Sequence, residues 1–210
     1  LRGDQVWCQG FSEPSAGSDL ASLRTRAVRD GDRYIVNGHK IWTSFAQVAD
    51  YGELLVRTDP DAPKHRGISW LILPMDAPGI EIRPLKTLVG EGEFSEVFLQ
   101  DVSVPVENLV GQENDGWRVT NVTLRFERGT AFVGEIVDMQ EWLRELARTA
   151  VKVTRHDARA WDDLALRREI GQLAAQLDAA WAMVKLSVSQ AASSGVPPIS
   201  RPQSFGVIFK

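Results

Sequence analysis

The first half of the chain alternates short apolar runs with turn-forming residues. Runs of this length, bounded by glycine and proline, are typical of strands in a compact β-barrel or sandwich. One turn is expected at Gly31, and Asn37-Gly38 predicts a tight hairpin turn, because both residue types tolerate positive φ. The predicted strands cover residues 23–28, 33–36, 39–43, 53–57, 68–73, 80–85 and 97–99.

The second half places apolar residues at three- and four-residue intervals, which predicts two long helices. The first begins near Trp117, capped by Asn114 or Asp115, and the second runs from about Leu166 to Val188. A polar segment separates them. Each helix has one apolar stripe that the pair cannot bury alone, so we expect a bundle completed by further helices or by a partner.

These two halves predict the α+β class. We expect a β-barrel or sandwich domain over residues 1–112, followed over residues 113–210 by part of an antiparallel helical bundle. The chain begins at Leu1 rather than Met and ends inside an apolar stretch, so we interpret it as an internal piece of a longer protein.

Composition excludes several classes of protein. With 43% hydrophobic and 25% charged residues the chain is globular rather than disordered, and a net charge of −4 disfavours nucleic-acid binding. No apolar run is long enough to span a membrane. The single cysteine, Cys8, excludes a disulfide framework and fits a reducing, cytoplasmic compartment. Three histidines far apart in the sequence predict no metal site.

Two segments carry the candidate chemistry. Residues 11–19, FSEPSAGSD, form a loop of small residues that lets a ligand approach the backbone and supplies hydroxyl donors. In residues 39–44, HKIWTS, Trp42 offers a flat face, and the hydroxyl of Thr43 or Ser44 could reach a ring nitrogen. The alternatives are a plain connecting loop and a core tryptophan.

These segments resemble the acyl-CoA dehydrogenase family. Residues 12–19 are similar to its TEPxAGSD signature, and residues 37–42 to its NGxKxWIT segment. Residues 101–108 match its DVxVPxEN strand, and Gly116-Trp117 matches the loop that opens its helical domain. Four matches in order and at consistent spacing are specific, whereas any one alone is weak.

The resemblance implies a fold, a cofactor and an activity. The chain would be the middle β domain and the first helices of the C-terminal domain of an FAD-dependent acyl-CoA dehydrogenase, of the bacterial fatty-acyl or sterol side-chain type. The family removes a proton from Cα and a hydride from Cβ of an acyl-CoA thioester, and the hydride goes to flavin N5. Electrons then pass to an electron-transferring flavoprotein. We expect a homo- or heterotetramer.

The first segment aligns with cofactor and substrate contacts of the family. Ser12 corresponds to a hydroxyl that binds the flavin pyrimidine, with Gln9 and Phe11 as its backbone neighbours. Ser18 corresponds to a contact of the CoA part of the substrate.

The second segment aligns with the other side of the flavin. Trp42 corresponds to the tryptophan beside the ring, and Thr43 and Ser44 are the candidate hydroxyls. Ser44 replaces the threonine that meets flavin N5, and Phe45 replaces a common asparagine.

Glu127 is the candidate base. It aligns with the glutamate that a minority of the family uses, whereas most members place the base in a late segment, which would lie beyond Lys210. Its expected helical neighbours are small or apolar and include no basic residue, which favours the raised pKa that a base needs. The alternative is a surface glutamate, with the late residue as base.

One segment departs from the family pattern. Residues 153–159, VTRHDAR, lack the Arg-x-x-Phe-Gly motif that contacts FAD of the neighbouring subunit. This keeps open an assembly of paired, non-identical subunits, and with it a non-catalytic partner subunit. An acyl-CoA oxidase or a flavin monooxygenase on the same scaffold is a further alternative.

Overall fold

A computed structural model describes residues 3–88, 90–130, 133–155 and 157–194. The chain forms two compact units, Leu1–Asn121 and Val122–Lys210. The first unit is a β domain and the second is helical, which confirms the predicted α+β class. None of the helices in the described ranges has the length and apolar character needed to cross a membrane.

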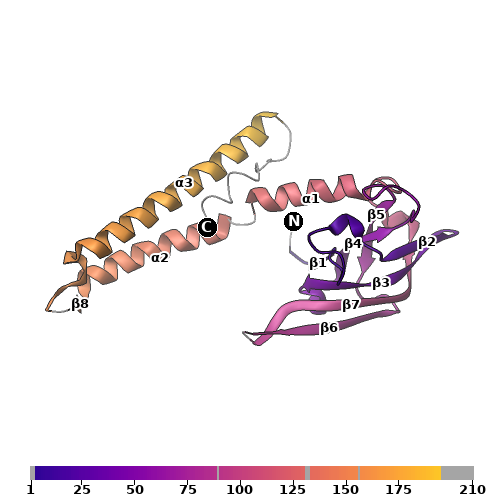
Figure 1. Cartoon of the computed structure of the whole chain (residues 1–210), viewed down its shortest axis with the longest axis horizontal. Coiled ribbons are helices and arrows are strands. Elements are labelled where there is room, and N and C mark those ends of the chain that lie inside the picture. Colours follow the sequence, from indigo (N-terminus) through magenta and orange to yellow (C-terminus); the bar gives the residue numbers. More distant parts are fainter. Residues whose placement is uncertain (1–2, 89, 131–132, 156, 195–210) are drawn as a thin grey trace. The chain divides into compact units, whose positions relative to one another are not determined.

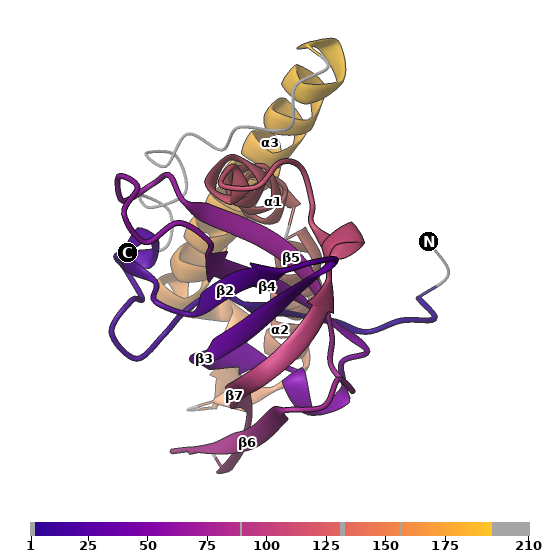
Figure 2. The same cartoon turned by 90° about the vertical axis from the view of Figure 1, so that its right-hand side faces the viewer.

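The β domain is built on one twisted sheet of seven strands (Figures 1 and 2). The order is β1-β4-β2-β3-β7-β6, and β5 lies off this path and pairs with β4. Neighbouring strands are antiparallel except where β4 meets β1 and β2. The strands are β1 (Trp7–Gly10), β2 (Arg26–Asp30), β3 (Arg33–Ser44), β4 (Tyr51–Arg57), β5 (Ile68–Pro74), β6 (Ile80–Thr87) and β7 (Gly90–Pro105).

One face of this sheet closes on an apolar core. Alternate residues of β3, β4 and β7 point inward, as the pleat of a strand requires, and Val36, Leu54 and Val102 are fully buried among them. Trp70 on β5 is buried, and so is Cys8 on β1. Burial raises the pKa of the Cys8 thiol to about 11, so this cysteine is a packing residue rather than a nucleophile.

The hairpin turn predicted at Asn37-Gly38 is wrong. The turn lies at Gly31, with φ of 60°, and Asn37 and Gly38 sit inside the continuous strand β3. Asn37 pairs through its side-chain amide with the backbone N–H and the carboxylate of Asp101, both at 2.9 Å. Gly38 leaves room for Thr25, because an added Cβ would lie 2.3 Å from the Thr25 hydroxyl oxygen. Close packing, not chain reversal, explains this Asn-Gly pair.

Most of the residues predicted to be helical lie in the helical unit. Where the sequence predicts one long first helix, the structure describes α1 (Gly116–Thr130) and α2 (Val133–Lys152); α1 begins in the β domain. The second predicted helix is α3 (Leu164–Ser194). The polar segment between α2 and α3 forms two short strands, β8 (Thr154–Arg155) and β9 (Ala158–Arg159).

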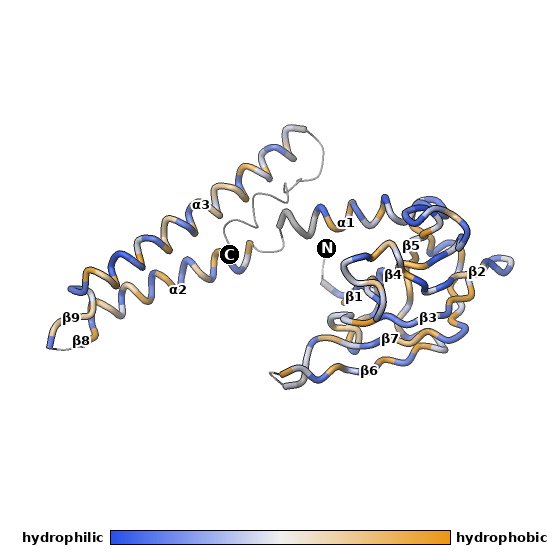
Figure 3. The backbone as a smooth tube through the Cα atoms, in the orientation of Figure 1, coloured by the Kyte–Doolittle hydropathy of each residue, from blue (hydrophilic) through white to orange (hydrophobic). Residues whose placement is uncertain are grey.

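Helices α2 and α3 pack along one apolar stripe. Ile136 contacts Ala180 and Val184 in the small core between them. Figure 3 shows hydrophobic and hydrophilic residues alternating along both helices. Beside this core, Trp142 is 70% exposed and Leu173 47% exposed, and both line an apolar groove of about 370 Å³. The two helices thus leave apolar surface uncovered within the described residues, in line with the expected larger bundle.

Candidate functional site

A cleft of about 400 Å³ opens beside the ends of β1 and β3. It brings together two segments that lie about thirty residues apart in the sequence. Five of the six predicted cofactor residues line it: Gln9, Phe11, Ser12, Trp42 and Ser44. The sixth, Thr43, does not.

The two segments are joined behind the cleft by hydrogen bonds. The backbone N–H of Ile41 donates to the carbonyl of Ser12 at 2.9 Å. The ammonium group of Lys40 donates to the carbonyl of Phe11 at 3.1 Å. The loop after β1 is therefore attached directly to β3, which sets the width of the cleft.

A β-bulge in β3 orients the side chains on the cleft. Lys40 pairs with Val97 and Thr43 with Ser95, so two residues of β3, Ile41 and Trp42, oppose a single residue of β7. Trp42 adopts φ of 61° at this bulge and is 58% exposed.

The bulge also explains the position of Thr43. Its side chain is buried on the core side, and its hydroxyl oxygen has no hydrogen-bond partner among the described residues. Ser44, the next residue, lines the cleft. Of the two candidate hydroxyls, the structure therefore places only that of Ser44 on the cleft, and a role of Thr43 in cofactor binding stays a prediction.

A buried ion pair lies behind the cleft, next to the lining residue Phe11. The Lys40 ammonium group lies 2.9 Å from the Glu13 carboxylate, and both side chains are almost completely buried. Glu13 also accepts hydrogen bonds from the backbone N–H groups of Arg24, at 2.7 Å, and Thr25, at 2.8 Å. One carboxylate thus connects the loop after β1, the beginning of β2 and the bulge of β3.

Burial acts on the pKa of both partners. It raises the pKa of Glu13, but the Lys40 charge and the hydrogen bonds outweigh it, so the pKa lies below its ordinary 4.5. Burial lowers the pKa of Lys40 to about 8, and Glu13 limits that fall. Both residues belong to motifs of the sequence, yet the sequence alone assigns them no role. One feature of the sequence could have indicated the role of Lys40. It occupies a position of a strand at which the pattern predicts a buried side chain, and a lysine at such a position needs a partner.

Ser18 is not among the residues that line this cleft. Ser18 is exposed in the loop after β1, next to Asp19, which forms an ion pair with Lys64. Glu127 lies on α1 in the second unit, and its side chain falls outside the described part of the structure, so its role as the base stays a prediction.

The residues of the cleft fit a flat heteroaromatic ring. Trp42, Phe45 and Phe11 supply aromatic surface, and the hydroxyls of Ser12 and Ser44 can serve a polar ring edge. Within the described ranges no three histidine, cysteine or acidic side chains gather as metal ligands would. This donor set suits an organic cofactor such as a flavin.

Comparison with known proteins agrees with this geometry. Residues 8–102 match the family described as acyl-CoA dehydrogenase, middle domain, and residues 114–203 match acyl-CoA dehydrogenase, C-terminal domain. The chain belongs to the acyl-CoA dehydrogenase family. The cleft between β1 and β3 lies within its middle domain, and α1 to α3 lie within its C-terminal domain.

Individual acyl-CoA dehydrogenases are similar over most of this chain. FadE34 of Mycobacterium tuberculosis is 50% identical over 75% of the chain, which covers 22% of FadE34. The solved Tcur3481-Tcur3483 steroid ACAD variant is 38% identical with a TM-score of 0.74, over 90% of this chain and 48% of that chain. The ChsE4-ChsE5 complex from M. tuberculosis is 38% identical with a TM-score of 0.73, over 90% and 49%. The chain thus spans half or less of each relative.

Proposed function

We propose that the protein containing this chain is an FAD-dependent acyl-CoA dehydrogenase that introduces an α,β double bond into an acyl-CoA thioester. The observation that carries the proposal is the cleft, which joins the aromatic and hydroxyl groups of two distant segments around one ring-sized space. Family membership of both halves of the chain supports it.

Residues of the cleft have separate tasks in this proposal. Trp42 covers the flavin ring, and the Ser44 hydroxyl donates a hydrogen bond to ring nitrogen N5. Ser12 and the backbone of Gln9 and Phe11 bind the pyrimidine edge. When bound, the flavin supplies a hydride acceptor, which no side chain can provide.

Two further residues serve the substrate. Glu127 takes the proton from Cα, while Ser18 binds the CoA portion. The thioester α-proton is weakly acidic, so the carboxylate must be desolvated and held in position. The electrons leave through an electron-transferring flavoprotein.

The substrate we propose is a thioester with a bulky, sterol-like acyl group. The support is the similarity to a solved protein whose title names it a steroid ACAD, at 38% identity over 90% of this chain. A straight-chain fatty acyl-CoA is the competing substrate class.

A second candidate is a subunit of a heteromeric dehydrogenase that completes its active site with a different chain. Residues 153–159 lack the Arg-x-x-Phe-Gly motif, and Thr154–Arg155 and Ala158–Arg159 instead form the short strands β8 and β9. A similar solved structure is a complex of two differently named proteins.

The visible absorption spectrum of the complete gene product tests both candidates. We expect a flavin band that bleaches on anaerobic addition of a steroid side-chain CoA thioester, with free CoA as the control. Bleaching only by straight-chain thioesters would contradict the substrate class. A bleached band that oxygen restores at the rate of turnover would favour an oxidase. Absence of flavin until a second chain is added would favour the heteromeric subunit.

A further inference from the structure

Within the part of the chain that the structure describes, aromatic residues with positive φ occur only at the cleft. Among the described residues, five other than glycine have positive φ: Trp42, Phe45, Asp101, Asn114 and Asp157. Three of these are Asp or Asn, which tolerate this conformation because their short polar side chains bond locally. The two aromatic exceptions both line the cleft between β1 and β3.

The path of the chain imposes this conformation on Phe45. Its backbone N–H donates to the carbonyl of Glu93 at 2.8 Å, and its carbonyl accepts from the N–H of Val48 at 3.0 Å. The next residue, Ala46, is buried in the core. With φ of 61° and ψ of 14°, Phe45 is in the left-handed helical region, where glycine or asparagine would be less strained.

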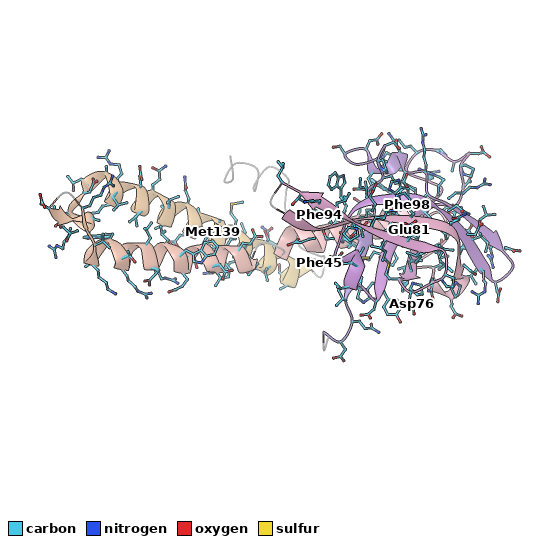
Figure 4. The ribbon with its side chains drawn as sticks, turned by 90° about the horizontal axis from the view of Figure 1, so that it is seen from below. Phe45, Asp76, Glu81, Phe94, Phe98 and Met139 are labelled. Carbon is cyan, nitrogen blue, oxygen red and sulfur yellow. The ribbon has the colours of Figure 1, made fainter. Side chains whose placement is uncertain are left out.

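The Phe45 ring is not needed to fill the core. The residue is 46% exposed, so the protein accepts both backbone strain and solvent exposure of a large apolar side chain at one position. Trp42, 58% exposed, packs edge-on against Phe94 at 6.0 Å between ring centroids. Figure 4 shows Phe45 and Phe94 at the same end of the β domain, away from Phe98 and Glu81. We use the name aromatic wall for Trp42, Phe45 and Phe94: the first two line the cleft, and Phe94 packs against Trp42.

We propose that Phe45 is a further contact of the flavin ring system and that its strained backbone is the cost of placing an aromatic face in the cleft. The inference rests on the proposed function, because it takes the flavin as the occupant. A flat ring of that size is complementary to the wall, and binding it would cover the exposed aromatic surface.

The test is a set of variants at this position in the complete gene product. Phe45→Asn should raise the unfolding midpoint of the flavin-free protein by about 3 °C, because it removes strain. It should also weaken binding of FAD, and of lumiflavin as a probe of the ring alone, by about tenfold. Phe45→Tyr should retain the affinity. Phe45→Leu should lose affinity without gaining stability.

Two controls separate the effects. Val48→Asn changes an exposed apolar residue of the same turn that does not line the cleft, and should leave flavin affinity unchanged. Asp157→Gly relieves positive φ in the other unit, and should also leave flavin affinity unchanged.

The outcomes are distinguishable. Higher stability with weaker flavin binding in Phe45→Asn supports the inference. Higher stability with unchanged flavin binding overturns the inference and leaves the proposed function standing. Lower stability shows that the backbone is not strained and also overturns it. If the unmodified protein binds neither FAD nor lumiflavin, the proposed function itself fails.

Discussion

Replacing Lys40 with methionine separates the buried carboxylate of Glu13 from its cation. Methionine keeps the length and apolar stem of lysine, so the change removes the charge, the 2.9 Å ion pair and the hydrogen bond to the Phe11 carbonyl. Glu13 then retains two backbone N–H donors in a site where it is 6% exposed. Breaking a buried pair in this way costs about 3–5 kcal/mol, a large part of the stability of a typical domain.

The loss depends on pH in a defined direction. In the unmodified protein the pKa of Glu13 is lowered, so its stabilising contribution is present above pH 4.5 and disappears as pH falls through the lower folded-state pKa. Without Lys40, burial dominates and raises the folded-state pKa of Glu13 above 4.5. The variant therefore loses stability as pH rises through that raised pKa, and its deficit is largest near neutral pH.

Urea unfolding followed by tryptophan fluorescence measures this deficit at pH 7 and again near pH 4.5. The double variant Lys40→Met/Glu13→Gln should recover much of the loss, because a neutral amide keeps an acceptor for the two N–H groups. Lys64→Met, which breaks the exposed pair with Asp19, serves as the control and should barely change the midpoint. A Lys40→Met deficit below about 1 kcal/mol at pH 7, or one equal at both pH values, would refute this account.

Five other substitutions test the site and the fold. Glu127→Gln should abolish reduction of bound flavin by acyl-CoA while flavin binding persists, as stopped-flow absorbance can show; unchanged reduction would place the base elsewhere. Gly38→Ala should destabilise the protein by about 2–4 kcal/mol in urea unfolding, because the added methyl group would lie 2.3 Å from the Thr25 hydroxyl oxygen. Gly171→Ala lies in open space on α3 and should stabilise the protein by about 1 kcal/mol in the same assay. Thr43→Val should leave flavin affinity unchanged, because the Thr43 hydroxyl faces the core and has no hydrogen-bond partner among the described residues. Ser44→Ala should weaken flavin affinity about tenfold, and the reverse order would contradict the placement of the two hydroxyls.

Local patterns in the sequence were sufficient for the class of each half. Residues 68–73 and 80–85 were expected as strands and lie within β5 and β6. The apolar spacing from Leu166 to Val188 lies within α3. These elements depend on side-chain periodicity over a few neighbouring residues, which the sequence displays directly. The motifs likewise identified the two segments that line the cleft.

Tertiary contacts decided how those segments are arranged. Whether Asn37-Gly38 turns or continues as a strand depends on Asp101 and Thr25, which pack against it from other segments. The side on which Thr43 and Ser44 lie depends on a bulge in the pairing of β3 with β7.

The ion pair behind the cleft is a second feature that the local sequence could not predict. Lys40 and Glu13 are 27 residues apart, and nothing in the local pattern of either residue specifies that they meet in the core. Their burial follows from the register of β3 against its neighbours and from the path of the loop after β1. The sequence by itself determined the class of each half and the location of most strands and helices. The packing of distant segments decided which side chains face the cleft, because that depends on strand register rather than on local propensity.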